Sequence, residues 1–305
     1  MTIDSLKKYF RPIYIPVIAE IKNIRMQISH PILIMSSLHT IRHIRKNNYS
    51  VCRYGDGELK IMFNKGNIGF QKWSDSLACE LKRVFYEENK NLLICLPACA
   101  VSTAGMKKYS SQYWRKWMLD DNNRVRLYEF ICKTGKKNYF FGDAMFTRPY
   151  MDWKRRKRAA KVFKELDLLW KDRKLLVVEG EQTRLGVGND LFCGAKSVRR
   201  IIVPAVGAYN SYAQIKNAVI SHLNEDLVLL AIGPTATVLA ADLSKMGIQA
   251  IDIGHIDIEY EWFLRNSDQK ERIPGKYVNE VADGRIFTEC NNTNYQRQII
   301  TRIDV

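Results

Sequence analysis

The sequence predicts an α/β fold in which a mostly parallel β-sheet carries helices on both faces. From residue 49 onward, short and continuously apolar segments of strand length alternate with longer segments of helical periodicity. Continuously apolar strands are typical of a sheet buried on both sides, and the alternation is typical of crossovers through helices. No internal repeat and no Pro-, Gly- or Ser-rich linker interrupts the pattern. We therefore expect a single compact body.

The expected elements can be placed in chain order. Strands are expected at residues 50–53, 92–96, 138–141, 175–179, 200–203, 227–232 and 250–253. Helices are expected at residues 74–86, 153–170, 211–223 and 235–246. The clearest unit is residues 227–253, where a strand leads through a Gly-Pro turn into a helix with Thr235 as its N-cap. Gly247 ends that helix, because glycine readily adopts the left-handed conformation that follows a helix.

A basic segment of 48 residues precedes the first strand. Residues 32–44 have the apolar spacing of a helix, and so do four earlier residues, Ile18, Ile21, Ile24 and Met26. The sequence leaves two interpretations of this extra helical N-terminal segment. It packs on the body with a solvated basic face, or it binds an anionic membrane surface or a partner.

Composition narrows the functional class. The chain has 48 Lys and Arg against 32 Asp and Glu, a formal net charge of +16, which predicts anionic partners: nucleic acid, lipid or a phosphate-bearing small molecule. The seven cysteines are scattered without a C-x-x-C pair, so neither a zinc knuckle nor a disulfide framework is expected, and a reducing cytosol is the expected location. No signal peptide and no apolar run of membrane-spanning length is present, which predicts a soluble protein.

The familiar nucleotide and nucleic-acid motifs are absent. The chain has no G-x-x-x-x-G-K-[ST] P-loop and no G-x-G-x-x-G after a strand. A basic run at residues 153–158 is accompanied by no RNP, zinc-finger or helix-turn-helix motif. We interpret the run as a solvated helix face, with contact to an anionic lipid or an acidic glycan as the next interpretation, and expect no nucleic-acid partner.

Two carboxylates follow the first expected strand, in the sequence Arg53-Tyr54-Gly55-Asp56-Gly57-Glu58. Asp56 and Glu58 supply the oxygen ligands that Mg²⁺ and Mn²⁺ prefer, and the glycines let the backbone approach a ligand closely. In open α/β sheets, ligands bind at the carboxyl ends of the strands. The alternative is a polar turn in which Asp56 caps a helix at residues 57–63 and Glu58 supports its dipole.

A second group of acidic residues follows the last expected strand: Asp252, His255, Asp257, Glu259 and Glu261. On a strand, the three at odd positions from 257 to 261 would share one face, whereas on a helix Asp257 and Glu261 would be neighbours. Acids beside a histidine suit a metal ligand and a general base. The alternative is a solvated acidic patch with a histidine at a helix start.

A Gly-rich loop at residues 179–190 follows another buried strand and is expected to precede a helical segment. Its backbone N–H groups, together with Arg184 at the start of that helix, could hold a phosphate. Gly-rich loops are also common as simple connections between helices and strands.

Three segments in this order resemble the bacterial GT-D-type glycosyltransferases, whose mark is an Asp-x-Glu metal motif in a strand-end loop. They are SVCRYGDGE with FQKWSDSLACELKRVF, VVEGEQTRLGVGNDLFCGAKSVRRIIVPA, and IDIGHIDIEYEW, and the likeness runs from about residue 35 to about residue 265. Tyr54 stands where that family leads us to expect Phe. The resemblance implies a Rossmann-like GT-D domain at residues 35–270, after a basic helical segment at 1–34 and before an extension at 271–305 packed on the same body.

The resemblance also implies a function. Members of that family are sugar-nucleotide-dependent enzymes of glycoprotein and surface-polysaccharide assembly, with glucose transfer from UDP-glucose as the known activity. By this likeness, Asp56 and Glu58 hold a divalent metal, Mn²⁺ or Mg²⁺, on the diphosphate. Residues 179–190 and 255–259 would line the same cleft.

These inferences combine into one hypothesis. The chain moves a hexose, glucose by preference, from a UDP-sugar to a protein- or lipid-linked glycan acceptor. Asp257 or Glu259 is the base, with His255 as a further catalytic residue. The expected donor-binding residues are Arg53, Gly55, Gly57, Glu181, Arg184, Gly186, Gly188, Asn189 and Asp190. The location expected is cytoplasmic, with peripheral contact at the inner face of the membrane; the oligomeric state is left open.

Two other functions remain alternatives. A non-enzymatic basic α/β module would bind nucleic acid or anionic membrane through residues 1–48 and 153–158, with salt-sensitive affinity that is indifferent to Asp56. A metal-dependent phosphohydrolase would share the acid pair but release phosphate without an acceptor.

Overall fold

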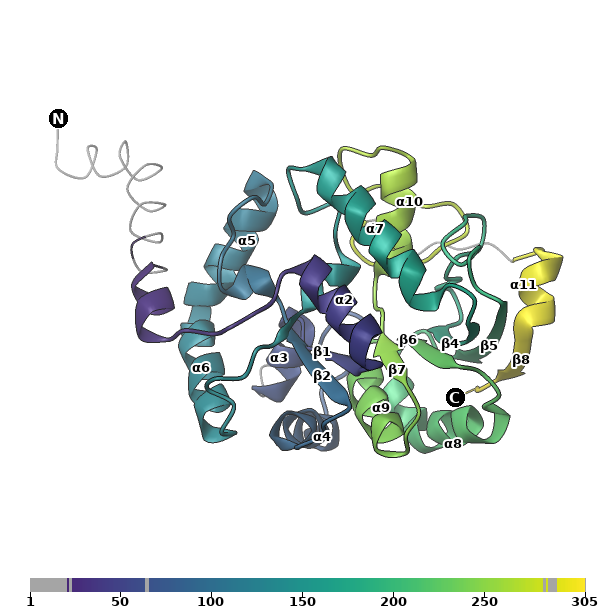
Figure 1. Cartoon of the computed structure of the whole chain (residues 1–305), viewed down its shortest axis with the longest axis horizontal. Helices are drawn as coiled ribbons and strands as arrows, with labels where there is room; N and C mark the ends of the chain where they lie inside the picture. Colours follow the sequence, from purple (N-terminus) through teal and green to yellow (C-terminus); the bar gives the residue numbers. More distant parts are fainter. Residues whose placement is uncertain (1–20, 22–23, 64–65, 282–283, 285–289, 305) are drawn as a thin grey trace.

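A computed structural model describes residues 21, 24–63, 66–281, 284 and 290–304. The predicted α/β fold is confirmed: the strands form one parallel sheet in the order β3-β2-β1-β7-β6-β4-β5-β8 (Figure 1). Every strand pair in it is parallel. The strands are β1 (Ser50–Arg53), β2 (Leu92–Leu96), β3 (Gly142–Asp143), β4 (Lys174–Gly180), β5 (Ser197–Val203), β6 (Leu227–Ala231), β7 (Ala250–Asp252) and β8 (Ile299–Arg302).

Helices cover both faces of this sheet (Figure 1). One face is covered by α2 (Ser37–Asn47), α7 (Arg156–Trp170) and α10 (Ile256–Leu264). The other is covered by α3 (Asp56–Met62), α4 (Asp75–Tyr86), α6 (Asn123–Lys133), α8 (Tyr212–His222) and α9 (Pro234–Lys245). Each face of the sheet has its own hydrophobic core, and successive strand residues point into opposite cores. Val177 packs with the first set of helices and Val178 with the second. Two further helices, α5 (Lys108–Leu119) and α11 (Thr293–Gln298), lie toward opposite ends of the sheet.

Most predicted strands appear within a few residues of their expected positions, but β3 differs. No strand forms at 138–141; β3 is Gly142–Asp143, and Phe141 just before it forms an isolated parallel bridge with Ile34 in the segment before α2. Gly142 also lies so close to the Cys95 side chain of β2 that a Cβ would overlap its sulfur. The strand β8 was not predicted; it pairs with β5 and extends the sheet by one edge strand.

Helix α9 begins one residue earlier than predicted. Its N-cap is Gly233 rather than Thr235, and Pro234 occupies the first helical position, where its missing N–H costs nothing. Gly247 follows the helix with a positive φ of 77°, as its predicted stop position requires.

Of the four residues of the predicted N-terminal helical stripe, Ile18 lies outside the described residues, Ile21 and Ile24 are exposed, and Met26 is partly buried. Residues 24–29 are helical, and Ile24 and Ile28 are exposed. Within the described part of the chain, no helix has the length and apolar character needed to cross a membrane. At the other end, Ile273 and Val278 are buried in the core beneath α7 and α10, which ties the C-terminal extension to the body.

Candidate functional site

A cavity of about 610 Å³ lies at the carboxyl ends of the strands. Residues that follow several neighbouring strands line it, among them Gly55 after β1, Gly254 after β7 and Gly233 after β6. Strands β1 and β7 are neighbours in the sheet, but the connections that follow them run in opposite directions. The chain continues from β1 to the adjacent β2 on one side, and from β7 to β8 at the far edge on the other side. Such a switch point opens a crevice where α/β proteins bind ligands.

The Asp56–Glu58 pair lies on this cavity. The turn after β1 leads at once into α3, whose N-cap is Gly55 and whose first residue is Asp56, so the alternative in which Asp56 itself caps the helix is wrong. Glu58 accepts a hydrogen bond from the Gly55 N–H at 2.8 Å, and the Asp56 carboxylate accepts one from the Tyr113 hydroxyl. Both acids line the cavity at a helix N-terminus, where the dipole favours negative charge.

The electrostatics of this pair fit a bound cation. Burial, and then repulsion from Asp252, raise the pKa of Glu58 to about 7. A divalent cation beside Glu58 would offset this crowding of negative charge. Among the residues that the structure describes, no group of three or more His, Cys, Asp or Glu side chains could hold a metal alone. A two-carboxylate site completed by water and substrate phosphates is the arrangement that Mg²⁺ usually adopts in proteins.

Arg53 stands beside the acids, at the end of β1. Its guanidinium donates to Asp252 at 3.1 Å and to the Thr147 hydroxyl at 2.8 Å, and it lines the cavity. Gly254 packs directly against it: a Cβ at residue 254 would overlap the guanidinium, and φ there is +44°. Only glycine fits between β7 and Arg53.

We expect Gly254→Ala to displace Arg53 and weaken binding of an anionic ligand in the cavity. Gly247→Ala is the matched control, because residue 247 also has positive φ but open space around its would-be Cβ. Both changes introduce backbone strain of about 1–2 kcal/mol, and only the first adds a steric clash. The check is UDP affinity by calorimetry alongside thermal unfolding. Equal behaviour of the two variants would contradict this account.

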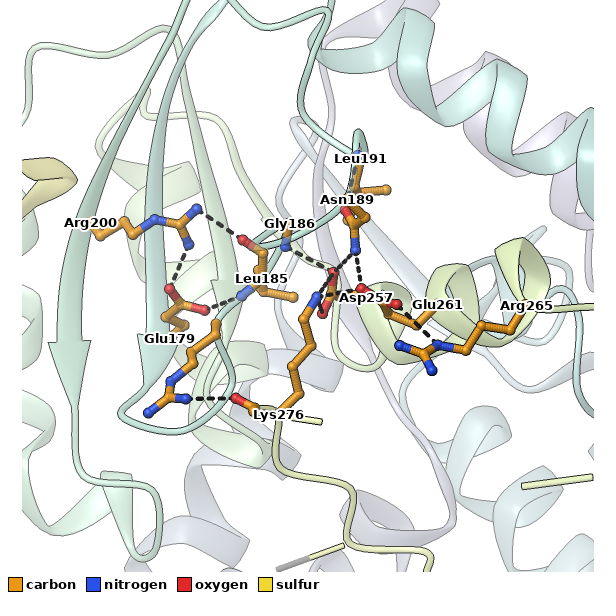
Figure 2. A network of polar contacts seen from close by, with 12 residues as sticks. Glu179, Leu185, Gly186, Asn189, Leu191, Arg200, Asp257, Glu261, Arg265 and Lys276 are labelled. Atoms are coloured by element: carbon orange, nitrogen blue, oxygen red, sulfur yellow. Dashed lines mark hydrogen bonds and ion pairs between the residues drawn. The ribbon is translucent and has the colours of Figure 1, made fainter. Parts of the chain in front are cut away.

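The segment after β7 forms the helix α10 (Ile256–Leu264). Of the two arrangements considered for its acidic residues, a strand and a helix, the structure therefore shows the helix. Asp257 and Glu261 meet at Lys276, whose ammonium lies 2.7 Å from Asp257 and 2.9 Å from Glu261 (Figure 2). Asp257 also accepts from the Gly186 N–H and from the Asn189 side chain. Asp257 lies on the cavity lining, but three donors reach its Oδ1, the Lys276 ammonium also reaches its Oδ2, and the residue is 1% exposed. This geometry favours Asp257 as an anchor of the Gly-rich loop over Asp257 as a base.

The Gly-rich loop itself is shaped by buried groups. The expected helix after it is wrong, because the loop turns directly toward β5 and Arg184 adopts a left-handed φ of 51°. Glu179 pairs with Arg200 at 2.6 Å and accepts the Leu185 N–H, while Arg200 donates to the Leu185 carbonyl (Figure 2). Of this loop, Gly180, Thr183 and Leu185 line the cavity.

The predicted donor residues therefore divide into two groups. Arg53, Gly55 and Gly57 line the cavity, together with the metal candidates. The residues predicted from the Gly-rich loop lie outside its lining: Glu181, Arg184, Gly186, Gly188, Asn189 and Asp190. Their roles toward a donor remain predictions, and the contacts of Asn189 and Gly186 are with Asp257.

Glu259 and His255 occupy different environments. Glu259 is fully buried and does not line the cavity. Its carboxylate accepts hydrogen bonds from the backbone N–H groups of Tyr150 and Met151, each at 2.9 Å. Burial raises its pKa to about 7. His255 lines the cavity with its Nε2 3.6 Å from Glu280 and without a hydrogen-bond partner. Burial lowers the pKa of His255 to about 4, so the ring is neutral at pH 7.

A model of the glycosyltransferase GT-D fold matches residues 51–281 of this chain. The chain belongs to the GT-D glycosyltransferase fold family. The resemblance carried by the three sequence segments is thereby confirmed. Every strand of the sheet except β8 begins within or one residue before the matched region.

Two streptococcal proteins are similar to most of this GT-D chain. The probable glycosyl transferase Gly of Streptococcus gordonii is 34% identical over 273 residues, which are 89% of this chain and 39% of that protein. The glycosyltransferase GlyD of Streptococcus pneumoniae serotype 4 is 30% identical over 265 residues, 87% of this chain and 32% of that protein. The chain thus spans well under half the length of either relative.

Solved structures show the same GT-D architecture. A structure of domain of unknown function 1792, described as having a distinct glycosyltransferase fold, aligns with a TM-score of 0.83 and 32% identity over 92% of this chain and 98% of its own. A glycosyltransferase of the same domain type from Streptococcus sanguinis aligns with a TM-score of 0.78 and 32% identity, over 90% of this chain and all of its own (100%).

Four charged residues of the GT-D cavity lining were not predicted: Arg148, Asp152, Lys270 and Glu280. Arg148 and Lys270 both form ion pairs with Glu280. Burial raises the pKa of Glu280, but the opposing effects of Arg148 first, and then of His255 and Lys270, hold it well below its usual range. Arg148 and Asp152 lie between β3 and α7, Lys270 follows α10, and Glu280 belongs to the C-terminal extension, and no periodicity or motif marks any of them.

Proposed function

We propose that this GT-D domain is a metal-dependent glycosyltransferase that moves a hexose from a UDP-sugar to a glycan acceptor. The observation that carries the proposal is the Asp56–Glu58 pair on a 610 Å³ cavity at the switch point of the sheet. Family membership supports the reaction class. Glucose as the donor sugar is our first choice, from the sequence resemblance.

The cavity supplies charges suited to a nucleoside diphosphate. Asp56 and Glu58 would hold the divalent metal, which when bound neutralises the charge that develops on the leaving diphosphate. Arg53 adds a cation fixed in place by Asp252 and Gly254. Arg148 and Lys270 add two more on the wall formed with Glu280. Fixed positive groups aimed at developing negative charge are the main source of catalysis in such sites.

We propose His255 as the group that takes the proton from the acceptor hydroxyl. Asp257 is bound to Lys276 and to donors of the Gly-rich loop, and Glu259 lies outside the cavity lining with its Oε2 bound to the backbone of residues 150–151. His255 lines the cavity, is neutral at pH 7 and keeps an unpartnered nitrogen.

His255→Asn is expected to lower the transfer rate by about 10²–10⁴-fold, the usual contribution of a general base. In the wild-type protein, transfer should decline as pH falls through about 4, because the imidazole becomes protonated there. The measurement is initial rate against pH, with UDP binding measured separately by calorimetry. An Asn variant that transfers at the wild-type rate would reassign the base to Asp257 or Glu259.

The direct test of the proposed function is calorimetric titration of UDP in the presence of Mn²⁺, of Mg²⁺ and of EDTA. We expect binding with either metal and its loss in EDTA. If neither metal nor UDP binds, the proposal fails and the basic-module alternative takes its place. That alternative has its own support in Lys157, Lys161 and Lys164, which are exposed along α7. Release of inorganic phosphate without an acceptor would instead indicate a phosphohydrolase.

A further inference from the structure

Helix α5 carries an aromatic stripe along one side. Tyr109, Tyr113 and Trp117 recur at intervals of four residues, which places them on one face of the helix. Tyr109 is 73% exposed and Tyr113 is 45% exposed, while Trp117 is half-buried. Trp114 lies beneath them in T-shaped contact with both Tyr113 and Trp117. Large aromatic rings held open to solvent on a packed base point to a ligand that covers them.

The stripe joins two cavities. Tyr109 and Tyr113 line the main cavity already described. Tyr113 and Trp117 line a second cavity of about 500 Å³. The two cavities share Asp56 and Tyr113, whose hydroxyl donates to the Asp56 carboxylate, so this pair forms the wall between them. A ligand lying along the stripe would therefore pass beside Asp56, which contacts the middle residue of the stripe.

The second cavity has a mixed polar lining. Lys60 and Arg126 provide cations, Asp120 a carboxylate and Asn123 an amide. The Asn123 amide donates to the Trp117 carbonyl at 2.9 Å, and the Arg126 guanidinium lies 5.1 Å from the ring centre of Phe63, so both are held in position. Donors and acceptors around an aromatic ring suit sugars, whose hydroxyls need both and whose C–H faces pack on rings.

We propose that Tyr109, Tyr113, Trp117 and the second cavity form the acceptor subsite, and that it takes an oligosaccharide chain rather than a single sugar. The proposal rests on the proposed function, because it seats the acceptor beside Asp56. Eight residues of helix separate Tyr109 from Trp117, about 12 Å at 1.5 Å per residue. The track is thus long enough for more than one sugar ring.

The charges of the subsite favour a neutral glycan over a polyanion. Single-stranded nucleic acid also stacks on aromatic rings, but its groove is positively charged along the backbone. Here the carboxylates of Asp56 and Asp120 lie on the second cavity, opposite in sign to Lys60 and Arg126. They would repel phosphates and accept hydrogen bonds from sugar hydroxyls.

The test is saccharide binding by the full chain labelled with ¹⁵N, without metal or nucleotide. The probes are methyl β-glucoside, cellotetraose, maltotetraose and an oligothymidylate. We expect one tetrasaccharide to shift the Trp117 indole signal and to bind at least about tenfold more tightly than the methyl glucoside, equivalent to about 1.4 kcal/mol. Tyr109→Ala should weaken that binding about tenfold, Tyr109→Phe should restore it, and Phe140→Ala should leave it unchanged, since Phe140 is 59% exposed away from both cavities.

Three results would overturn the subsite: no shift at Trp117 with any saccharide, wild-type affinity in Tyr109→Ala, or stripe binding by the oligothymidylate instead. A chain that binds saccharide on the stripe but binds neither UDP nor metal keeps this subsite and loses the proposed function. A chain that binds UDP and metal but no saccharide does the reverse.

Discussion

Asp56→Asn is expected to lower the metal-dependent release of UDP from a UDP-sugar by about 10²–10³-fold or more, and Glu58→Gln to do the same. Each change removes one negative oxygen ligand while keeping the size of the side chain. The amide oxygen of Gln at residue 58 can still accept from the Gly55 N–H, and that of Asn at residue 56 from the Tyr113 hydroxyl, so the turn before α3 should keep its shape. The measurement is UDP release together with Mn²⁺ affinity.

Asp75→Asn is the matched control for this pair. Asp75 is likewise an acid in the first turn of a helix, but α4 carries it at an exposed position outside the cavity lining. It should therefore keep wild-type activity. Full activity in Asp56→Asn and Glu58→Gln would show that these carboxylates serve only the helix dipole.

Lys276→Ala is expected to produce the largest loss of stability, about 3–5 kcal/mol, because it leaves two buried carboxylates without their cation. Lys276 is 4% exposed and bridges Asp257 and Glu261, which are 1% and 7% exposed (Figure 2). The bridge fastens the C-terminal extension to α10 and, through Asn189, to the Gly-rich loop. The measurement is urea unfolding at pH 7.

The pH dependence of this loss has a defined sign. Although burial acts in the opposite direction, the ion pair with Lys276 holds the pKa of Glu261 below its ordinary 4.5. The ionised carboxylate therefore stabilises the fold above that pH, and this stability is lost as the pH falls below it. The deficit of Lys276→Ala should therefore shrink on acidification below about pH 4.5. Lys245→Ala, which removes an exposed ion pair with Glu87, is the control and should cost less than about 1 kcal/mol. Equal losses in the two variants would contradict a buried anchoring role for Lys276.

The sheet could be predicted because its signal is local. Strands such as β2 and β4 are runs of consecutive buried apolar residues, and the connecting helices show their own periodicity. The position of Asp56 and Glu58 on the cavity could be predicted for the same reason, because they follow β1 closely and the carboxyl ends of parallel strands face the crevice. No tertiary information was needed for either.

The opposite wall of the cavity could not be predicted, because distant segments build it. Arg148 and Glu280 are 132 positions apart and meet only through the fold. The residue types alone also favoured Asp257 and Glu259 as the base, whereas Asp257 forms an ion pair with Lys276 and Glu259 lies outside the cavity lining, bound to the backbone of residues 150–151. Strand β8 is short and only partly buried, so it lacks the apolar run that marks the central strands.

We propose above all that Asp56 and Glu58 hold a divalent metal for sugar transfer from a nucleotide donor. The most direct measurement is UDP release by the wild-type chain from a panel of UDP-sugars, with Mn²⁺, Mg²⁺ or EDTA, and with oligosaccharide acceptors added in turn. We predict release from one UDP-sugar, highest for UDP-glucose, that requires metal and rises when an acceptor is present. Release that is unchanged in EDTA, or no release from any donor by protein that is folded, would contradict it.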